Sequence, residues 1–97
     1  MLEEAYEANP KSYYILDSLA WAHYKKNNLD LAAELMEKVI DMAPGEAISL
    51  DHLGDIYFSL NRKREAVFLW NQAKDLAEPE ENIYENIIKK LENYYEG

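Results

Sequence analysis

The sequence predicts an all-α solenoid built from helix–turn–helix repeats, with about six helices. Pro10 and Pro44 are separated by about 34 residues, a common length for a helical repeat. Pro79 follows Pro44 at nearly the same interval. Between these prolines, apolar residues recur at steps of three and four, which is the spacing of one face of a helix. Each interval holds two such stretches, separated by a polar break. A two-helix unit of this length is typical of repeat proteins, in which neighbouring units pack on one another.

The first interval, residues 11–44, contains two predicted helices with a break at Asn27-Asn28. Asparagine tolerates the left-handed backbone that commonly ends a helix. Pro44-Gly45 ends the second helix. The packed face of the first helix comprises Leu16, Leu19, Ala20 and His23, and that of the second comprises Ala32, Leu35, Met36, Val39 and Ile40.

The second interval, residues 45–78, repeats this pattern with a break at Asn61. A shift by one repeat length, the interval from Pro10 to Pro44, places Leu16 on Leu50 and Met36 on Trp70. The small residues at the facing positions leave room for the two helices of a repeat to approach closely, and the large ones are expected to fill space against the next repeat. The packed faces comprise Leu50, Leu53, Gly54 and Tyr57 on the first helix, and Ala66, Leu69, Trp70 and Ala73 on the second.

The N-terminal residues 1–10 continue the same register. Leu2 and Ala5 fall on Met36 and Val39 when the chain is shifted by one repeat length. We therefore expect residues 1–10 to be the second helix of a preceding repeat whose first helix is missing. On this interpretation the chain is the C-terminal part of a longer array.

The C-terminal residues 79–97 are predicted to form a capping helix. Pro79 suits the first turn of a helix, and the two glutamates after it suit the positive end. An array needs such a helix because its last repeat would otherwise expose an apolar side. We expect Ile83, Ile87 and Leu91 to face the array, and Lys89, Lys90, Glu92 and Asn93 to supply polar surface.

The second interval resembles the tetratricopeptide repeat (TPR) family, in particular the closing repeat of bacterial members. The residues that carry the resemblance are Leu53-Gly54, Tyr57, Ala66, Trp70, Ala73 and Pro79. The first interval fits the same signature through Leu19-Ala20, Ala32, Val39 and Pro44, but His23 and Met36 stand where the family usually has aromatic residues. The resemblance implies a right-handed superhelical array with repeats at residues 11–44 and 45–78.

The resemblance also implies that the first helix of each repeat lines a concave groove. The residues that lie off the packed stripe of these helices are Tyr14, Asp17, Trp21, Tyr24, Ile48, Asp51, Asp55 and Phe58. This set is aromatic and acidic, so it would suit a peptide or helix that carries Lys or Arg and apolar anchors. The alternative is that the aromatic residues pack between helices and the aspartates form a solvated face. The groove aspartates argue against the clamp for a C-terminal carboxylate that some family members use.

Composition excludes several classes of function. The net charge of −9 argues against nucleic acid and anionic membrane surfaces as partners. The chain has no cysteine, no apolar run of about 20 residues and no signal-peptide pattern. His52 and Asp55 could hold a metal only weakly, because a site needs three or four converging ligands. No catalytic or phosphate-binding motif occurs, and no cofactor is expected.

The sequence thus favours a protein-binding scaffold without catalysis. A second hypothesis is self-assembly, in which the apolar ends of the array pair with another copy. An enzyme is the third class, and no reactive constellation supports it. The identity of the partner stays open, and so does a cytoplasmic or a periplasmic location.

Overall fold

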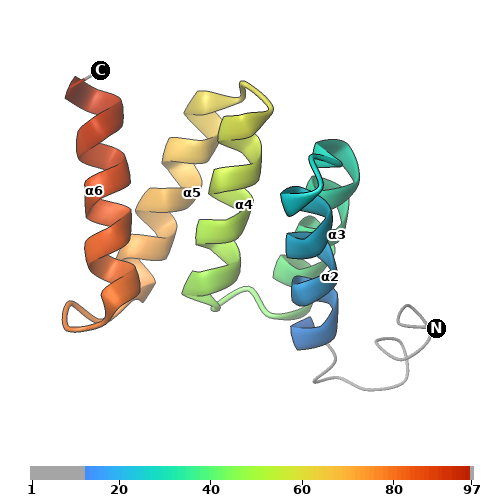
Figure 1. The fold of residues 1–97 in the computed structure, drawn as a ribbon. Helices are drawn as coiled ribbons and strands as arrows, with labels where there is room; N and C mark the ends of the chain where they lie inside the picture. The colour runs from blue at the N-terminus through green and yellow to red at the C-terminus, as the bar shows by residue number, and fades with distance from the viewer. Residues whose placement is uncertain (1–12, 97) are drawn as a thin grey trace.

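The computed structural model describes residues 13–96, and these residues form five helices in a row (Figure 1). The helices are α2 (Tyr13–Lys25), α3 (Leu29–Met42), α4 (Ala47–Ser59), α5 (Lys63–Leu76) and α6 (Asn82–Glu96). No strand occurs in this range. The all-α array is therefore confirmed, while the helix expected at residues 1–10 lies outside the described residues.

The same turn joins the two helices of each repeat. Asn27 and Asn61 have positive φ angles of 68° and 65°, respectively. The amide that follows each of them donates to a carbonyl five residues earlier, from Asn28 to His23 at 2.9 Å and from Arg62 to Tyr57 at 2.8 Å. This is the Schellman ending, which asparagine permits because it tolerates left-handed backbone. The predicted breaks are thus helix ends with one common geometry.

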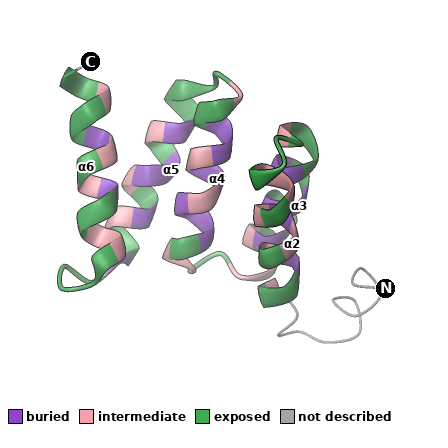
Figure 2. Ribbon diagram, viewed as in Figure 1, coloured by how far each residue is buried: buried purple, intermediate pink, exposed green. Residues whose placement is uncertain are grey.

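The buried residues lie where the helices face one another along the row (Figure 2). Ala20, Ala32 and Ala66 have no exposed surface, as expected for positions where two helices approach closely. The largest side chains that are almost fully buried are Leu16, Met36, Ile56, Ile87 and Val39. Ile87 and Leu91 of α6 are buried in the same core, and Ile83 is partly buried against it.

The two aromatic residues expected to fill space against the next repeat also make contacts within their own repeat or with the preceding one. Trp70 lies against Gly54 of its own repeat, where a Cβ atom added to the glycine would come within 2.5 Å of the indole. Tyr57 points back towards the preceding repeat and donates a hydrogen bond to Glu37 of α3. The absence of a side chain at Gly54 therefore makes room for the indole within the repeat.

Candidate functional site

The helices α2, α4 and α6 occupy equivalent places along the row. α4 begins one repeat length after α2, and α6 begins at nearly the same interval after α4. Side chains in the same register therefore come from all three helices, with Tyr24, Phe58 and Asn93 as one such set. α6 thus takes the place that the first helix of a further repeat would occupy.

The eight residues predicted to line the groove form four pairs, each related by one repeat length across α2 and α4. Tyr14, Ile48 and Phe58 are the exposed apolar members, with 63%, 52% and 38% of their surface accessible. Trp21, Tyr24, Asp17 and Asp55 are half-buried. Asp51 is buried, with 8% of its surface accessible. The apolar members are thus more available to a partner than the acidic ones.

Asp17 of α2 is already held by two residues of α4. Ser49 donates a hydrogen bond to Asp17 Oδ2 at 2.7 Å, and His52 Nδ1 lies 3.1 Å from Asp17 Oδ1. Burial opposes ionisation of this carboxyl, but the hydrogen bonds from His52 and Ser49 outweigh it and lower the pKa of Asp17. Asp17 therefore joins the first helices of the two repeats.

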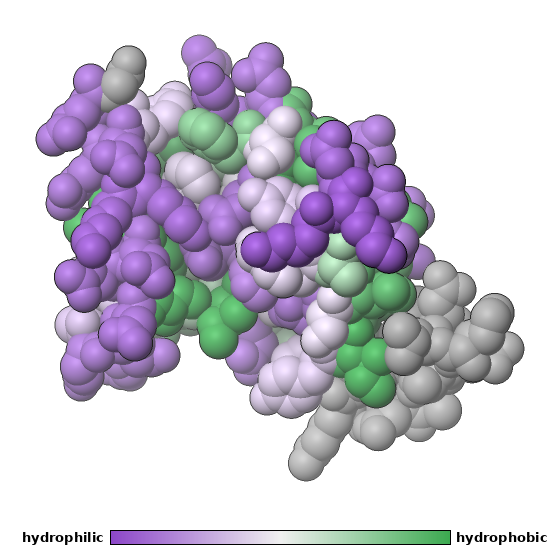
Figure 3. Space-filling model, in the orientation of Figure 1, coloured by the Kyte–Doolittle hydropathy of each residue, from purple (hydrophilic) through white to green (hydrophobic). Residues whose placement is uncertain are grey.

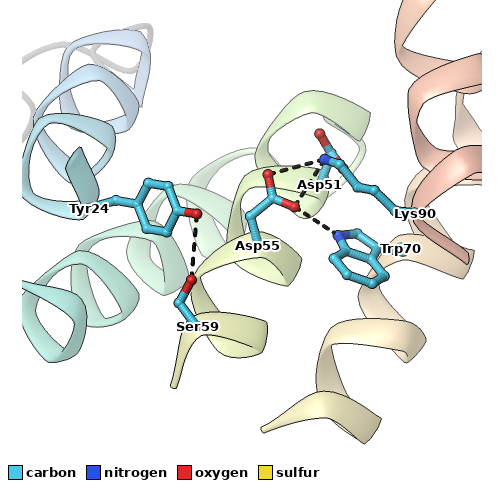
Figure 4. A network of polar contacts seen from close by, with 6 residues as sticks. All are labelled: Tyr24, Asp51, Asp55, Ser59, Trp70 and Lys90. Atoms are coloured by element: carbon cyan, nitrogen blue, oxygen red, sulfur yellow. Dashed lines mark hydrogen bonds and ion pairs between the residues drawn. The ribbon is translucent and has the colours of Figure 1, made fainter. Parts of the chain in front are cut away.

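Asp51 and Asp55 share a single ammonium group, that of Lys90 on α6 (Figure 4). Lys90 Nζ lies 2.8 Å from Asp51 Oδ1, and 2.9 Å and 3.1 Å from the two oxygens of Asp55. Trp70 Nε1 also donates to Asp55 Oδ1 at 3.2 Å. Burial, followed by the charge of Asp51, raises the pKa of Asp55 despite these contacts. The pair of carboxylates is therefore incompletely neutralised.

Aromatic rings lie on the same face of the array as these aspartates, the face formed by α2, α4 and α6. The Trp21 ring stacks on His52 at a centroid distance of 4.0 Å and on Tyr24 at 4.6 Å. Lysine side chains lie over two of the rings, with Lys25 Nζ 5.5 Å from the Trp21 centroid and Lys63 Nζ 5.4 Å from that of Phe58. These separations are within the range of cation–π attraction.

Two of the hollows on this face lie near the ends of α2, one at each end. The first has a volume of about 310 Å³ and lies between α2, α4, α5 and α6. Its lining residues are Tyr24, Asp55, Phe58, Ser59, Trp70, Lys90, Asn93 and Tyr94. The second has a volume of about 200 Å³ and is lined by Tyr13, Tyr14, Asp17, Ser18, Glu46, Ile48 and Ser49. Six of the eight predicted residues thus line a hollow, and Trp21 and Asp51 line neither.

The arrangement offers binding chemistry. Within residues 13–96, no three His, Cys, Asp or Glu side chains converge as a metal site would require. His52 pairs with Asp17 and not with Asp55, the partner that the sequence suggests. No helix in this range is long and apolar enough to span a bilayer. What the face does provide is aromatic surface, hydroxyl and amide groups, and a carboxylate pair.

Lys90 is the residue of this site that sequence reasoning misses, because the helical pattern assigns it to the polar surface of the cap. Its ammonium group instead bridges to α4, and its side chain is 29% exposed. A signal is present in the sequence: Lys90 follows Asp55 by 35 residues, which is also the interval from Pro44 to Pro79. The register of the groove residues, extended into α6, therefore places Lys90 on the same face as Asp55.

Comparisons with known proteins agree on one kind of repeat. The family model described as tetratricopeptide repeat matches residues 1–47 and 18–77. A crystal structure of a tetratricopeptide repeat domain protein from Salinibacter ruber has a TM-score of 0.78 at 22% identity, covering 87% of this chain and 96% of that one. A solution NMR structure of such a domain from the same organism has a TM-score of 0.76 at 23% identity, covering 88% of each chain. No curated protein shows a significant match.

Proposed function

The chain belongs to the tetratricopeptide repeat family, and from this membership we propose that it is a non-catalytic scaffold that binds a peptide or helix of a partner protein. Repeats of this family commonly serve as protein-interaction modules. The proposed binding surface is the face formed by α2, α4 and α6. It includes the eight groove residues named from the sequence, with Lys90 and Tyr94 added from α6.

The observation that carries the proposal is the combination of exposed apolar side chains with two hollows on one face. Phe58 is exposed at the rim of the larger hollow, and Tyr14 and Ile48 are exposed at the smaller one. Large apolar side chains that fill pockets supply most of the energy of protein interfaces. Contiguous exposed apolar patches on folded domains are typical of contact sites.

The chemistry of the face favours a partner segment with apolar anchors and basic residues. The chain carries a net charge of −9, which attracts a basic partner and accelerates its encounter. Asp17 and Asp51 already form hydrogen bonds with other side chains of this chain. They would therefore attract a basic partner through the electrostatic field more than through direct contacts. The anchors would occupy the hollows, and the stacked ring of Trp21 would lie between them.

A random peptide library displayed on phage tests this proposal with the 97-residue chain as bait. Selected peptides should bind the wild type and lose affinity for the double variant Trp21→Ala, Phe58→Ala. Phe68→Ala is the matched control, because Phe68 is 64% exposed but lies on α5, outside the proposed face. Circular dichroism establishes that each variant is folded. Peptides that bind the double variant as tightly as the wild type would reject the groove as the binding site.

A second candidate function is self-assembly, and a hollow on α2 favours it. This hollow is lined by Tyr14, Ile15, Ser18, Leu19 and Ala22. Ile15 is 39% exposed, whereas Ser49, the equivalent residue of α4, is 2% exposed and donates a hydrogen bond to Asp17 of α2. Apolar side chains also gather over the lower end of α2 in Figure 3, while α6 is largely hydrophilic.

Light scattering over a range of concentrations separates the two candidates. Self-assembly through α2 predicts a dimer that Ile15→Glu dissociates and that the double groove variant leaves intact. A monomer at all concentrations would reject self-assembly and leave the peptide-binding proposal in place.

A further inference from the structure

The larger hollow is lined by aromatic rings and charged groups. Tyr24, Phe58, Trp70 and Tyr94 contribute the rings, and Asp55 and Lys90 contribute the charged groups. We propose that this hollow is a subsite for an arginine side chain of the bound partner, and that Lys90 limits its affinity. The inference rests on the proposed peptide-binding function and names the residue that this part of the face recognises.

The first support is the charge of the cluster at the hollow, in which Asp55 and Lys90 line the hollow and Asp51 is buried and contacts Lys90. Two carboxylates, Asp51 and Asp55, face one ammonium group, so the cluster carries a net charge of −1 when all three are ionised. The raised pKa of Asp55 has burial as its largest cause and repulsion from Asp51 as the next. A second cation near Asp55 would relieve this repulsion, whereas an anion would increase it.

The second support is that cations of the chain itself already lie over the rings of this face. Lys63 Nζ is 5.4 Å from the Phe58 centroid, and Lys90 Nζ is 5.9 Å from that of Trp70. The Phe58 and Trp70 rings are 5.5 Å apart and inclined by 30°. A cationic side chain in the hollow would contact the same aromatic surface while being partly removed from water, which strengthens the attraction.

Arginine fits the hollow better than lysine. A guanidinium is planar, weakly hydrated and able to stack on an aromatic ring while it donates hydrogen bonds in its plane. The rim offers acceptors for those bonds, because Tyr24 and Ser59 contribute hydroxyl groups and Asn93 an amide. Tyr24 and Ser59 face one another at 3.5 Å, a weak contact that a stronger donor can replace. The volume of about 310 Å³ accommodates the side chain.

Substitution of Lys90 tests the proposal, because an increase or a decrease in affinity shows whether the hollow binds a cation or an anion. If the hollow binds a cation, Lys90 repels it and competes for the same carboxylates, so removal of this charge should increase affinity. If the hollow binds a carboxylate, Lys90 would be the residue that attracts it, and removal should decrease affinity. Lys90→Met keeps the apolar stem of the side chain, and Lys90→Gln is the second variant should the first fail to fold.

The experiment measures binding of an arginine-containing peptide, selected from the phage library, by isothermal titration calorimetry to the full chain. Replacement of the arginine by citrulline, its neutral analogue, should weaken binding to the wild type about tenfold. Asp55→Asn should weaken binding of the arginine peptide and abolish the difference between the two peptides. Lys90→Met should strengthen binding of the arginine peptide severalfold.

Lys89→Met is the matched control and should leave binding unchanged. Lys89 loses the same charge on the same helix, but it is 68% exposed and lies near Glu85. Equal binding of the two peptides by the wild type would overturn the inference and leave the proposed function intact. So would weaker binding by Lys90→Met or Lys90→Gln. A library that yields no binder removes the proposed function itself.

Discussion

Gly54→Ala should destabilise the protein, although alanine is the better helix former. Gly54 lies within α4, and the indole of Trp70 on α5 occupies the space that a side chain at residue 54 would need. A Cβ atom at Gly54 would lie 2.5 Å from both Cδ1 and Nε1 of Trp70, and 3.2 Å from Cε2. Non-bonded carbon atoms reach their optimal separation at about 3.5–4.0 Å, so the indole would have to move.

The surroundings of Trp70 make this movement costly. The side chain is 4% exposed, and its Nε1 donates to Asp55 Oδ1 at 3.2 Å. Overpacking of a core costs about 1–3 kcal/mol, and a weakened hydrogen bond adds about 1 kcal/mol. The higher helix propensity of alanine stabilises the folded state by about 1 kcal/mol and so offsets part of this loss. We therefore expect a net loss of about 1–3 kcal/mol in the free energy of unfolding, a large fraction of the total for a domain of this size.

Urea denaturation followed by circular dichroism measures this loss. Gly45→Ala is the control, because a Cβ atom at Gly45 meets nothing within 4 Å and its φ angle is not positive. It should be neutral or stabilise by about 0.4–1 kcal/mol. In a Trp70→Leu background, Gly54→Ala should cost less than it does alone, because the two residues are in contact. A Gly54→Ala variant as stable as the wild type would refute the steric reasoning.

Three further outcomes are expected. Leu91→Ala should cost about 2–3 kcal/mol in thermal or urea denaturation because Leu91 is 6% exposed, whereas Leu76→Ala, at a site 49% exposed, should cost much less; equal losses would contradict the packing of α6. The lowered pKa of Asp17 means that its stabilisation is complete above the unfolded pKa of about 4 and is lost as the pH falls through the lower folded pKa. Asp17→Asn should therefore lower stability at neutral pH and flatten the decline in stability below about pH 4; an unchanged pH profile would contradict it. Tyr57→Phe should cost about 1 kcal/mol by removing the hydrogen bond to Glu37, as urea denaturation can check, and no loss would show that this bond contributes nothing.

Much of the fold follows from local rules that the sequence displays. The tolerance of asparagine for left-handed backbone predicts the breaks at Asn27 and Asn61, and both residues have positive φ. The repeat pattern predicts Ala20, Ala32 and Ala66 at close helix approaches, and all three are fully buried. These features depend on neighbours within one or two turns or on the repeat period, and both are visible in a single sequence.

The polar contacts between repeats could not be predicted in the same way. Periodicity places Lys90 on a helix face, but it does not say how far a flexible four-carbon side chain reaches. Lys90 extends from α6 to Asp51 and Asp55 on α4, a contact that depends on the distance between helices that are not consecutive. For the same reason, the sequence does not predict which partners the groove aspartates contact or how far they are buried. The use of the groove by a partner stays a prediction.

The row-like arrangement has a consequence for how the molecule holds together. α4 packs against α3 on one side and α5 on the other, whereas α6 packs chiefly against α5. Cohesion in such an array is a sum over adjacent helices, so unfolding should proceed inwards from α6, and amide protons of α4 should exchange last. A polypeptide laid across α2, α4 and α6 would brace helices that touch one another little. Binding of such a polypeptide should therefore make the thermal unfolding of the five helices sharper and more cooperative.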